Sequence, residues 1–301
     1  MKYYVLYNSV AGKGRSEEVA HSLKSKLEGD IVGFADMTKI TNYEAFLSDK
    51  SDCTLVICGG DGTLNRFVND TVDLGLTNEV YYCASGSGND FLRDIGGEIE
   101  TPIRITDYIK NLPQCEVNGK KYLFVNGIGY GIDGYCCEEG DKLRAAGKTD
   151  INYAGIAIKG LLFHYKPTNA TVTVDGVKRH YKKVWIAPTM NGRFYGGGMM
   201  PTPNQVRNNP EGKLSVLLFH ASGKIKTLMI FPSLFKGEHL KNKKYIELLS
   251  GNDITVEFDS PAPLQIDGET IVGVMKYRAY GEKVANISES DAKEQTLEAV
   301  L

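Results

Sequence analysis

The sequence has few of the residue patterns that mark disulfide-bonded or zinc-binding proteins. Its six cysteines form no Cys-x-x-Cys pair, and its five histidines show no His-Glu-x-x-His spacing. Zinc sites usually need closely spaced ligands of this kind. Three of the cysteines, Cys53, Cys58 and Cys83, lie in or beside apolar runs. We therefore expect reduced thiols in a cytoplasmic protein.

The chain also lacks a large excess of charge of either sign. It carries 35 Lys and Arg residues against 37 Asp and Glu residues, which gives a formal net charge of −2. No long block of one sign occurs. Proteins that bind nucleic acids normally present a strongly basic face. The composition therefore argues against nucleic acid as a partner.

No apolar run is long enough to cross a bilayer as a helix. One of the longest, residues 151–165, is interrupted by Lys159 and by glycines, whereas a spanning helix needs about 20 mostly apolar residues. We see no signal peptide before the first expected strand. The expected location is the cytoplasm, with only peripheral contact to the inner face of the membrane.

The first third of the chain alternates between strand and helix patterns. Apolar runs predict strands over residues 3–7, 31–35, 54–58 and 79–83. Amphipathic segments predict helices beginning near Ser16, Thr63 and Asn89, and a capping box at 41–44 predicts a further short helix. Repeated β-α units imply a doubly wound α/β domain, in which helices cover both faces of a parallel sheet.

From about Lys121 the pattern changes to short, often alternating apolar runs separated by turn residues. These runs are residues 122–125, 170–174, 181–186, 214–219, 254–258 and 275–280, with helical interruptions near 151–164 and 224–240. This pattern is typical of an antiparallel β-sandwich. We predict a nucleotide-binding α/β domain over residues 1–118 and a β-sandwich domain over 119–287. Whether the tail, 288–301, returns to the first domain stays open.

The expected third strand ends in a glycine-rich turn that contains one carboxylate, Gly59-Gly60-Asp61-Gly62-Thr63. Glycines can aim successive N–H groups into one concavity, and such a nest binds anions. The helix that follows would favour phosphate through its dipole. Asp61 would repel a phosphate unless a cation lies between them. The turn therefore predicts a metal-bridged polyphosphate, most simply a magnesium nucleotide.

Two further loops of glycine and small polar residues follow neighbouring strands, at residues 8–15 and 85–90. Ligands of open α/β sheets bind outside the carboxyl ends of the strands. Three such loops on one edge therefore specify a site better than any one of them, although each alone is an ordinary tight turn. Lys13 and Arg15 are either phosphate ligands or solvated surface residues. The loop at 8–15 lacks the spacing of a Walker A motif.

A literal dinucleotide fingerprint, Gly-x-Gly-x-x-Gly, occurs at residues 129–134. The residues after it are weakly periodic and the surrounding domain looks antiparallel, so we do not expect a Rossmann site there. Asp133 lies between glycines and is expected to be accessible at close quarters.

Near the C-terminus, Asp267 and Glu269 stand two positions apart after an apolar run. In an extended strand they would project to the same side. Two such carboxylates can share a proton, so that one pKa rises and the pair acts as a general base for a hydroxyl. The alternative is an exposed Asp-Gly turn in a β-hairpin.

Two surface features are weaker. Residues 196–201 combine glycines with methionines and either line an apolar pocket or simply turn. Four lysines surround apolar residues in the segment 234–244, namely Lys236, Lys241, Lys243 and Lys244. Such a patch suits an anionic membrane surface, although a solvated helix end explains it nearly as well.

With both Gly59-Gly60-Asp61-Gly62-Thr63-Leu64-Asn65 and Ser85-Gly86-Ser87-Gly88-Asn89-Asp90-Phe91 in view, the chain resembles the diacylglycerol kinase catalytic-domain family. It is most similar to the small soluble bacterial lipid kinases, which are related to sphingosine kinases. The resemblance implies catalysis in a cleft between the two domains. It also implies that ATP is held by Asn8, Gly59, Gly60, Gly62, Thr63, Ser87, Gly88 and Asn89.

The same resemblance implies roles for the acidic residues. Asp61, Asp90 and Asp133 would organise Mg²⁺ and its waters, and Asp267 with Glu269 would activate the lipid hydroxyl. Some positions depart from the family pattern: Ser9 replaces a common proline, Ser87 a usual threonine, and Arg66 a usual acid. In the segment 208–214, where the family often binds a second metal, Glu211 is the one carboxylate.

The sequence thus predicts an ATP- and Mg²⁺-dependent lipid kinase that phosphorylates a primary hydroxyl of a diacylglycerol-like lipid presented at a membrane. One alternative is an NAD kinase, which shares the Gly-Gly-Asp-Gly turn and a similar domain plan. Another is a catalytically silent regulator of the same fold that binds nucleotide or lipid. The oligomeric state stays open, a homodimer included.

Overall fold

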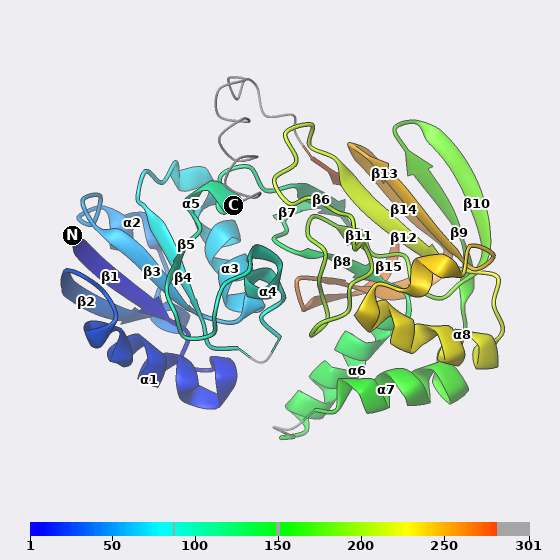
Figure 1. Ribbon diagram of the computed structural model, residues 1–301, viewed down its shortest axis with the longest axis horizontal. Coiled ribbons are helices and arrows are strands. Elements are labelled where there is room, and N and C mark those ends of the chain that lie inside the picture. Colours follow the sequence, from blue (N-terminus) through cyan, green and yellow to red (C-terminus); the bar gives the residue numbers. More distant parts are fainter. Residues whose placement is uncertain (87, 149–150, 282–301) are drawn as a thin grey trace.

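Two β-sheets organise the molecule into two domains that lie side by side (Figure 1). The computed structural model describes residues 1–86, 88–148 and 151–281, without the side chains of residues 12, 13 and 154. The predictions for Ser87, for the side chain of Lys13 and for the tail at 288–301 therefore lie outside the described residues. No helix of the described residues is long and apolar enough to cross a membrane.

The first sheet has the strand order β2-β1-β3-β4-β5. The strands are β1 (Lys2–Tyr7), β2 (Asp30–Asp36), β3 (Thr54–Gly59), β4 (Val80–Ala84) and β5 (Ile103–Arg104). The first four pair in parallel, whereas the two-residue β5 runs antiparallel to β4 at the edge. The expectation of a purely parallel sheet is corrected at this edge only. Every residue of the central strand β3 is buried, which explains its unbroken apolar sequence.

Helices cover both faces of this sheet, as a doubly wound domain requires. On one face lies α1 (Arg15–Ser22), whose Val19 and Ala20 pack against alternate residues of β1 and β3. On the other face lie α2 (Tyr43–Leu47), α3 (Asp61–Thr71) and α4 (Asp90–Ile95), around Phe67 and Phe91. A further short helix, α5 (Thr106–Ile109), follows β5. The predicted α/β class is confirmed.

Single 3₁₀ turns extend or join these elements. They are η1 (Ala11–Gly14), η2 (Leu23–Ser25), η3 (Met37–Lys39) and η4 (Val72–Leu74).

Two helix starts differ from the sequence prediction. The short helix α2 is capped by Asn42, whose side-chain oxygen accepts the N–H of Ala45 at 3.0 Å, so the capping box placed at Thr41 is wrong by one residue. The helix α3 begins at Asp61 rather than Thr63, because Gly60 is extended and serves as its N-cap residue. Asp61 therefore stands in the first turn of a helix.

The second sheet has the strand order β13-β12-β11-β8-β14-β15-β6-β7, with β9 pairing β14 and β10 pairing β9. Each of these pairs is antiparallel. The strands are β6 (Gln114–Val117), β7 (Lys120–Leu123), β8 (Gly127–Tyr130), β9 (Thr168–Val174), β10 (Val177–Val184), β11 (Thr189–Met190), β12 (Leu214–Phe219), β13 (Ile246–Gly251), β14 (Asp253–Ile266) and β15 (Glu269–Tyr280). The predicted antiparallel sandwich domain is confirmed.

The predicted domain boundary at residue 118 falls inside the hairpin of β6 and β7. Because β6 pairs with β15, the second sheet already begins at Gln114. A change of hydrophobic period could not locate this point, because a four-residue strand is too short to show one.

Helical segments cover one side of the second domain around Trp185 and Leu217. They are α6 (Ile132–Ala145), α7 (Tyr153–Lys159), the π-helical turn η5 (Gly160–His164), α8 (Lys224–Ile230), and the 3₁₀ turns η6 (Phe231–Lys236) and η7 (His239–Lys241). Figure 1 shows α6, α7 and α8 along the lower edge of this domain. The helix α6 was not expected, because its sequence is only weakly periodic.

Candidate active site at the domain interface

The three predicted loops of the first domain do meet at the carboxyl edge of its sheet. Asn8, after β1, donates from its side-chain amide to the hydroxyl of Thr63 at 3.0 Å. Ser16, at the start of α1, hydrogen-bonds Ser85, after β4, at 2.8 Å. A Cβ added at Gly86 would lie 2.6 Å from the Cα of Gly60, so these two loops touch through their backbones. The geometry thus joins all three loops into one surface.

The glycine turn after β3 is not a left-handed nest. None of Gly59, Gly60 and Gly62 has a positive φ, and Gly60 is extended while Gly62 lies in the first turn of α3. Donors for an anion would instead come from the N–H groups in the first turn of α3, where the N–H of Thr63 already donates to the carbonyl oxygen of Gly60 at 3.0 Å. Gly59 is required for another reason: a Cβ there would lie 2.5 Å from three atoms of the Thr63 side chain.

Asp61, in the first turn of α3, connects this helix to the start of α4. Its Oδ2 accepts the N–H of Asp90 at 2.9 Å, and its Oδ1 accepts the N–H of Phe91 at 2.9 Å. The side-chain amide of Asn126, between β7 and β8 of the second sheet, donates to Oδ1 at 3.2 Å. Asp61 thus places negative charge at the N-terminus of α4, where the helix dipole favours it.

Asp90 is buried beside Asp61 and is only partly satisfied. Its Oδ2 accepts the N–H of Gly197 from the second domain at 2.7 Å, whereas its buried Oδ1 has no hydrogen-bond partner among the described residues and lies 3.7 Å from the guanidinium of Arg93. The Oδ1 of Asn89 is also buried and has no partner in the part of the chain that the structure describes. Burial, and then the negative charge of Asp61, raise the pKa of Asp90 to about 6. A metal ion here would act together with Arg93 in relieving the repulsion between the carboxylates of Asp61 and Asp90.

Asp267 joins the two domains. Its Oδ2 accepts the side-chain amide of Asn65 in α3 at 2.8 Å and also the N–H of Val125. Its Oδ1 accepts the N–H groups of Asn126 at 2.8 Å and Gly127 at 2.9 Å. Burial raises the pKa of Asp267, although the backbone N–H donors act in the opposite direction. The carboxylate therefore lies where α3 of the first domain meets the segment between β7 and β8 of the second.

Asp267 and Glu269 do not lie together in one extended strand, so this prediction is wrong. Asp267 and Gly268 form the two-residue turn between β14 and β15, with φ of 46° and 98°, and Ile266 pairs with Glu269 across it. This is the Asp-Gly hairpin considered as the alternative. The turn is not, however, merely exposed, because it carries the carboxylate of Asp267 into the domain interface. Glu269 is exposed, and its Oε1 would lie 3.9 Å from a Cβ added at Gly62.

Asp133 is buried in the second domain rather than accessible. Gln265 donates to its Oδ2 at 3.4 Å, and burial raises the pKa of Asp133 to about 7. The buried hydroxyl of Tyr195 is close enough to lower the pKa of this carboxyl, although it meets no hydrogen-bond partner among the described residues. The prediction that Asp133 is accessible is therefore wrong, because α6 packs against the sandwich and encloses this side chain.

The four residues predicted to bind metal do not form one cluster. Within the described ranges, no three Asp, Glu, His or Cys side chains gather where they could hold an ion. Glu211 lies in the loop before β12 and pairs with Lys213. Asp61 and Asp90 do lie together, since a Cβ at Gly88 would be 3.3 Å from Oδ2 of Asp61 and 3.8 Å from Oδ2 of Asp90. Mg²⁺ at phosphate sites usually takes only one or two carboxylates, so this pair fits it.

Comparison with known proteins agrees with this arrangement. The model of the diacylglycerol kinase catalytic domain matches residues 2–114, and that of the YegS C-terminal NAD kinase beta sandwich-like domain matches residues 126–279. The chain belongs to the diacylglycerol kinase catalytic-domain family. A diacylglycerol kinase of Mycobacterium tuberculosis is 24% identical over 254 residues, which cover 80% of each chain.

The fold of this family member also matches solved structures. A crystal structure titled as a diacylglycerol kinase from Bacillus anthracis superposes with a TM-score of 0.59. It covers 93% of this chain and 94% of that chain at 18% sequence identity. At this identity the similarity establishes the shared two-domain fold.

Some residues that build the interface were not singled out from the sequence. Asp94, on α4, accepts from Arg193 at 2.7 Å and from Arg207 at 2.8 Å, and both arginines belong to the second domain. Arg207 also donates to the side chain of Asn126 at 2.8 Å. These residues are distant in sequence and match no motif, so only the fold brings them together. Asn65 could have been inferred, since it lies one helical turn after Asp61.

The dinucleotide fingerprint in this family member forms no Rossmann site, as expected, and its glycines serve close packing instead. A Cβ added at Gly129 would lie 1.6 Å from Oδ2 of Asp133, and one at Gly134 would lie 1.9 Å from the carbonyl oxygen of Pro263. Both glycines let α6 approach the sheet closely. The strand β8 is antiparallel to its neighbours, so no Rossmann crossover exists here.

The loop at residues 196–201 does more than turn, because it reaches the first domain through Gly197 and Asp90.

Arg66 stands on α3 where an acid is usual in the family. It pairs with Asp70 one helical turn along at 3.3 Å, and both side chains are exposed.

Proposed function

We propose that the protein is an ATP- and Mg²⁺-dependent lipid kinase that transfers the γ-phosphoryl group to a primary hydroxyl of a diacylglycerol-like lipid. The observation that carries this proposal is the meeting of Asp61 and Asp267 at one domain interface. Asp61 accepts the N–H of Asp90 and so joins two of the loops that suit a polyphosphate. Asp267 reaches from the sandwich domain to Asn65 of α3, and Asn126 donates to both carboxylates. Membership of the diacylglycerol kinase family supports the choice of a lipid acceptor.

In this proposal the nucleotide lies against the three loops of the first domain. The N–H groups at the start of α3 and the side chains of Asn8 and Thr63 would bind its phosphates, with Gly88 and Asn89 on the other side. Asp61 and Asp90 would hold Mg²⁺. The ion would neutralise charge on the transferred phosphoryl group. Catalysis by the chain itself would then consist mainly of positioning and of excluding water.

Asp267 is proposed as the general base for the lipid hydroxyl, with Glu269 beside it. Burial raises the pKa of Asp267 and so makes its carboxylate a better proton acceptor. Of its four hydrogen-bond donors, Asn65 is the one side chain. We infer that the lipid hydroxyl takes the place of this amide, because a side chain can rotate away whereas the three backbone donors are fixed.

The proposal is tested by incubating the protein with radiolabelled ATP, Mg²⁺ and a panel of lipids in mixed micelles, with NAD as a parallel acceptor. We expect label in a glycerolipid with a free primary hydroxyl. Asp61→Ala should reduce transfer by at least about 100-fold. Asp70→Ala, on the exposed side of the same helix, is the matched control and should leave transfer unchanged. Transfer to NAD alone, or ATP binding with no turnover on any lipid, would overturn the proposal.

A further inference from the structure

Two helical segments of the second domain contain lysines but no acidic residue. Residues 151–166 include Lys159 and Lys166, and residues 223–237 include Lys224, Lys226 and Lys236. The whole chain, by contrast, has more acidic than basic side chains. The two segments form α7, η5, α8 and η6, and we refer to their exposed side as the α7–α8 surface.

Large apolar side chains stand out from this surface. Phe163 is 72% exposed, Ile225 is 76% exposed and Met229 is 69% exposed, and Ile158 and Phe235 are also exposed. Single exposed apolar residues are common on soluble proteins, but several on neighbouring turns mark a site of interaction. Other residues of the same turns, such as Leu161 and Leu234, are buried, so the helices already have a core-facing side.

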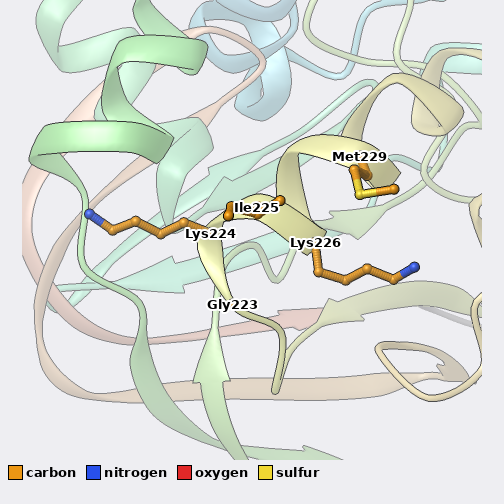
Figure 2. Close-up of a pocket in the computed structure, with 5 residues that line it drawn as sticks. All are labelled: Gly223, Lys224, Ile225, Lys226 and Met229. Carbon is orange, nitrogen blue, oxygen red and sulfur yellow. The ribbon is translucent and has the colours of Figure 1, made fainter.

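The two segments adjoin each other. Lys224 donates from its ammonium to the carbonyl oxygen of Leu162 at 2.7 Å, which ties the start of α8 to η5. A shallow surface hollow follows, lined by Gly223, Lys224, Ile225, Lys226 and Met229. Figure 2 shows the ammonium groups of Lys224 and Lys226 directed to opposite sides of the first turn of α8. Ile225 and Met229 are four residues apart and therefore share one face of the helix.

The acidic residues of the neighbouring helix α6 are largely paired with cations of the same helix. On α6, which packs against α7, Glu138 and Glu139 both pair with Lys142, and Asp141 pairs with Arg144. The exposed Lys159, Lys166 and Lys236 have no such carboxylate within their own segments. Apolar side chains with lysines beside them suit one partner in particular, namely an anionic bilayer, because the apolar groups insert while the ammonium groups meet lipid phosphates.

We propose that the α7–α8 surface is the membrane-docking surface of this protein and that it binds bilayers rich in anionic phospholipid. This inference extends the proposed function, and rests on it in one respect: a kinase that acts on membrane lipids needs contact with the bilayer. Of the lysines that the sequence suggested for this role, Lys236 belongs to the surface. Lys241 instead pairs with Glu238, whereas Lys244 lies over the ring of Tyr245, as Lys226 of the surface also does.

The experiment measures co-sedimentation of the full-length protein with vesicles of phosphatidylcholine alone or mixed with phosphatidylglycerol. We expect binding to the anionic vesicles that weakens as salt rises. The triple variant Phe163→Ser, Ile225→Ser, Met229→Ser should bind at least about tenfold more weakly, since it removes three groups that would leave water. The double variant Lys159→Gln, Lys236→Gln should lose most of the preference for anionic vesicles.

A matched control removes three exposed apolar residues elsewhere, by Val72→Ser, Ile99→Ser and Val177→Ser. It should bind vesicles like the wild type, and circular dichroism melts should show that all variants fold. Phosphorylation of a short-chain diacylglycerol below its micellar concentration should be the same in the triple variant and the wild type. Loss of vesicle binding thus becomes separable from loss of catalysis.

Three results would overturn the proposal. The wild type could fail to bind vesicles of either composition, or the triple variant could bind as tightly as the control. Alternatively, sedimentation could show a dimer that the triple variant abolishes while vesicles leave the wild type unbound. If vesicle binding behaves as expected but no lipid is phosphorylated, the kinase proposal fails and the docking surface stands.

Discussion

At the scale of single residues, Asp267 combines a structural with a chemical task. Its carboxylate accepts hydrogen bonds from three consecutive backbone N–H groups and from Asn65 in the other domain. A buried N–H without an acceptor costs about 1 to 3 kcal/mol. The residue proposed as the base therefore also holds the domain interface, whereas Glu269 beside it is exposed.

We expect Asp267→Ala to lower the free energy of unfolding by about 3 kcal/mol or more, because three N–H groups lose their acceptor. Transfer should fall by at least about 100-fold, while the affinity of the folded variant for ATP stays nearly unchanged. Glu269→Ala is the control for stability, with an expected change within about 0.5 kcal/mol. Denaturant unfolding and steady-state kinetics measure both. Retained activity in Asp267→Ala would refute its assignment as the base.

The buried carboxyl of Asp133 makes stability depend on pH in an unusual direction. Its pKa is about 7 in the folded protein, above the ordinary value of 3.8 that the unfolded chain would show. Between these values the folded state holds a proton that the unfolded state has lost. Stability therefore falls as pH rises from about 4 to 7, and the loss is complete above the folded pKa.

Asp133→Asn, which cannot ionise, should remove this dependence. The difference in unfolding free energy between variant and wild type should grow in favour of the variant by up to about 1.4 kcal/mol per pH unit between pH 4 and 7. Above pH 7 the difference should level off. Urea unfolding of both proteins at four pH values measures it. A difference that stays constant with pH would show that Asp133 is ionised throughout.

At the scale of elements, the junction of β3 with α3 depends on two glycines in different ways. A Cβ at Gly59 would collide with Thr63, whereas a Cβ at Gly62 would lie 3.9 Å from the nearest described atoms outside its helix, in Asp267 and Glu269. Thr63 in turn holds Asn8 and so connects the loops after β1 and β3.

Gly59→Ala should therefore destabilise the protein by about 1 to 3 kcal/mol, the range typical of overpacking, and should weaken ATP binding. Gly62→Ala should fold with at least wild-type stability, because alanine favours the helix by up to about 1 kcal/mol. It should nevertheless impair transfer, since its methyl group enters the space beside Glu269 where we place the phosphates. Thermal melts and ATP titrations separate the two variants. Equal stability of both would contradict the packing explanation.

At the scale of the whole molecule, a buried ion pair fastens one domain to the other. Arg207 and Asp94 have side-chain exposures of 5% and 3%, and they connect the loop before β12 to α4. Arg207 also lies over the ring of Phe91, 4.8 Å from its centroid. Removing one partner of such a pair leaves the other charge buried and unpaired, which commonly costs about 3 to 5 kcal/mol.

Asp94→Ala should cost about this amount and should loosen the interface, so that the two domains unfold in separate transitions. Arg104→Ala is the control, because its pair with Glu79 lies on the surface and is expected to contribute less than about 1 kcal/mol. Differential scanning calorimetry measures both. A single unchanged transition in Asp94→Ala would show that the ion pair does not hold the domains together.

Local patterns in the sequence were enough to predict the two domain classes, the four parallel strands of the first sheet and the convergence of three loops. Each follows from short-range rules: apolar runs form strands, and parallel strands bring their carboxyl ends to one edge. The same rules failed for α6, whose weak periodicity hides a helix stabilised by packing, and for the start of α3, which the extended Gly60 sets.

What the tertiary structure alone decided is the environment of each carboxylate. Asp61, Asp90, Asp133, Glu211 and Asp267 were all predicted site residues, yet Asp133 is enclosed in the sandwich domain and Glu211 pairs with Lys213. Asp267 reaches the site from a hairpin turn, through contacts with residues 140 or more positions away. Burial and partners separated this far along the chain leave no local trace, because they arise only when the two domains pack together.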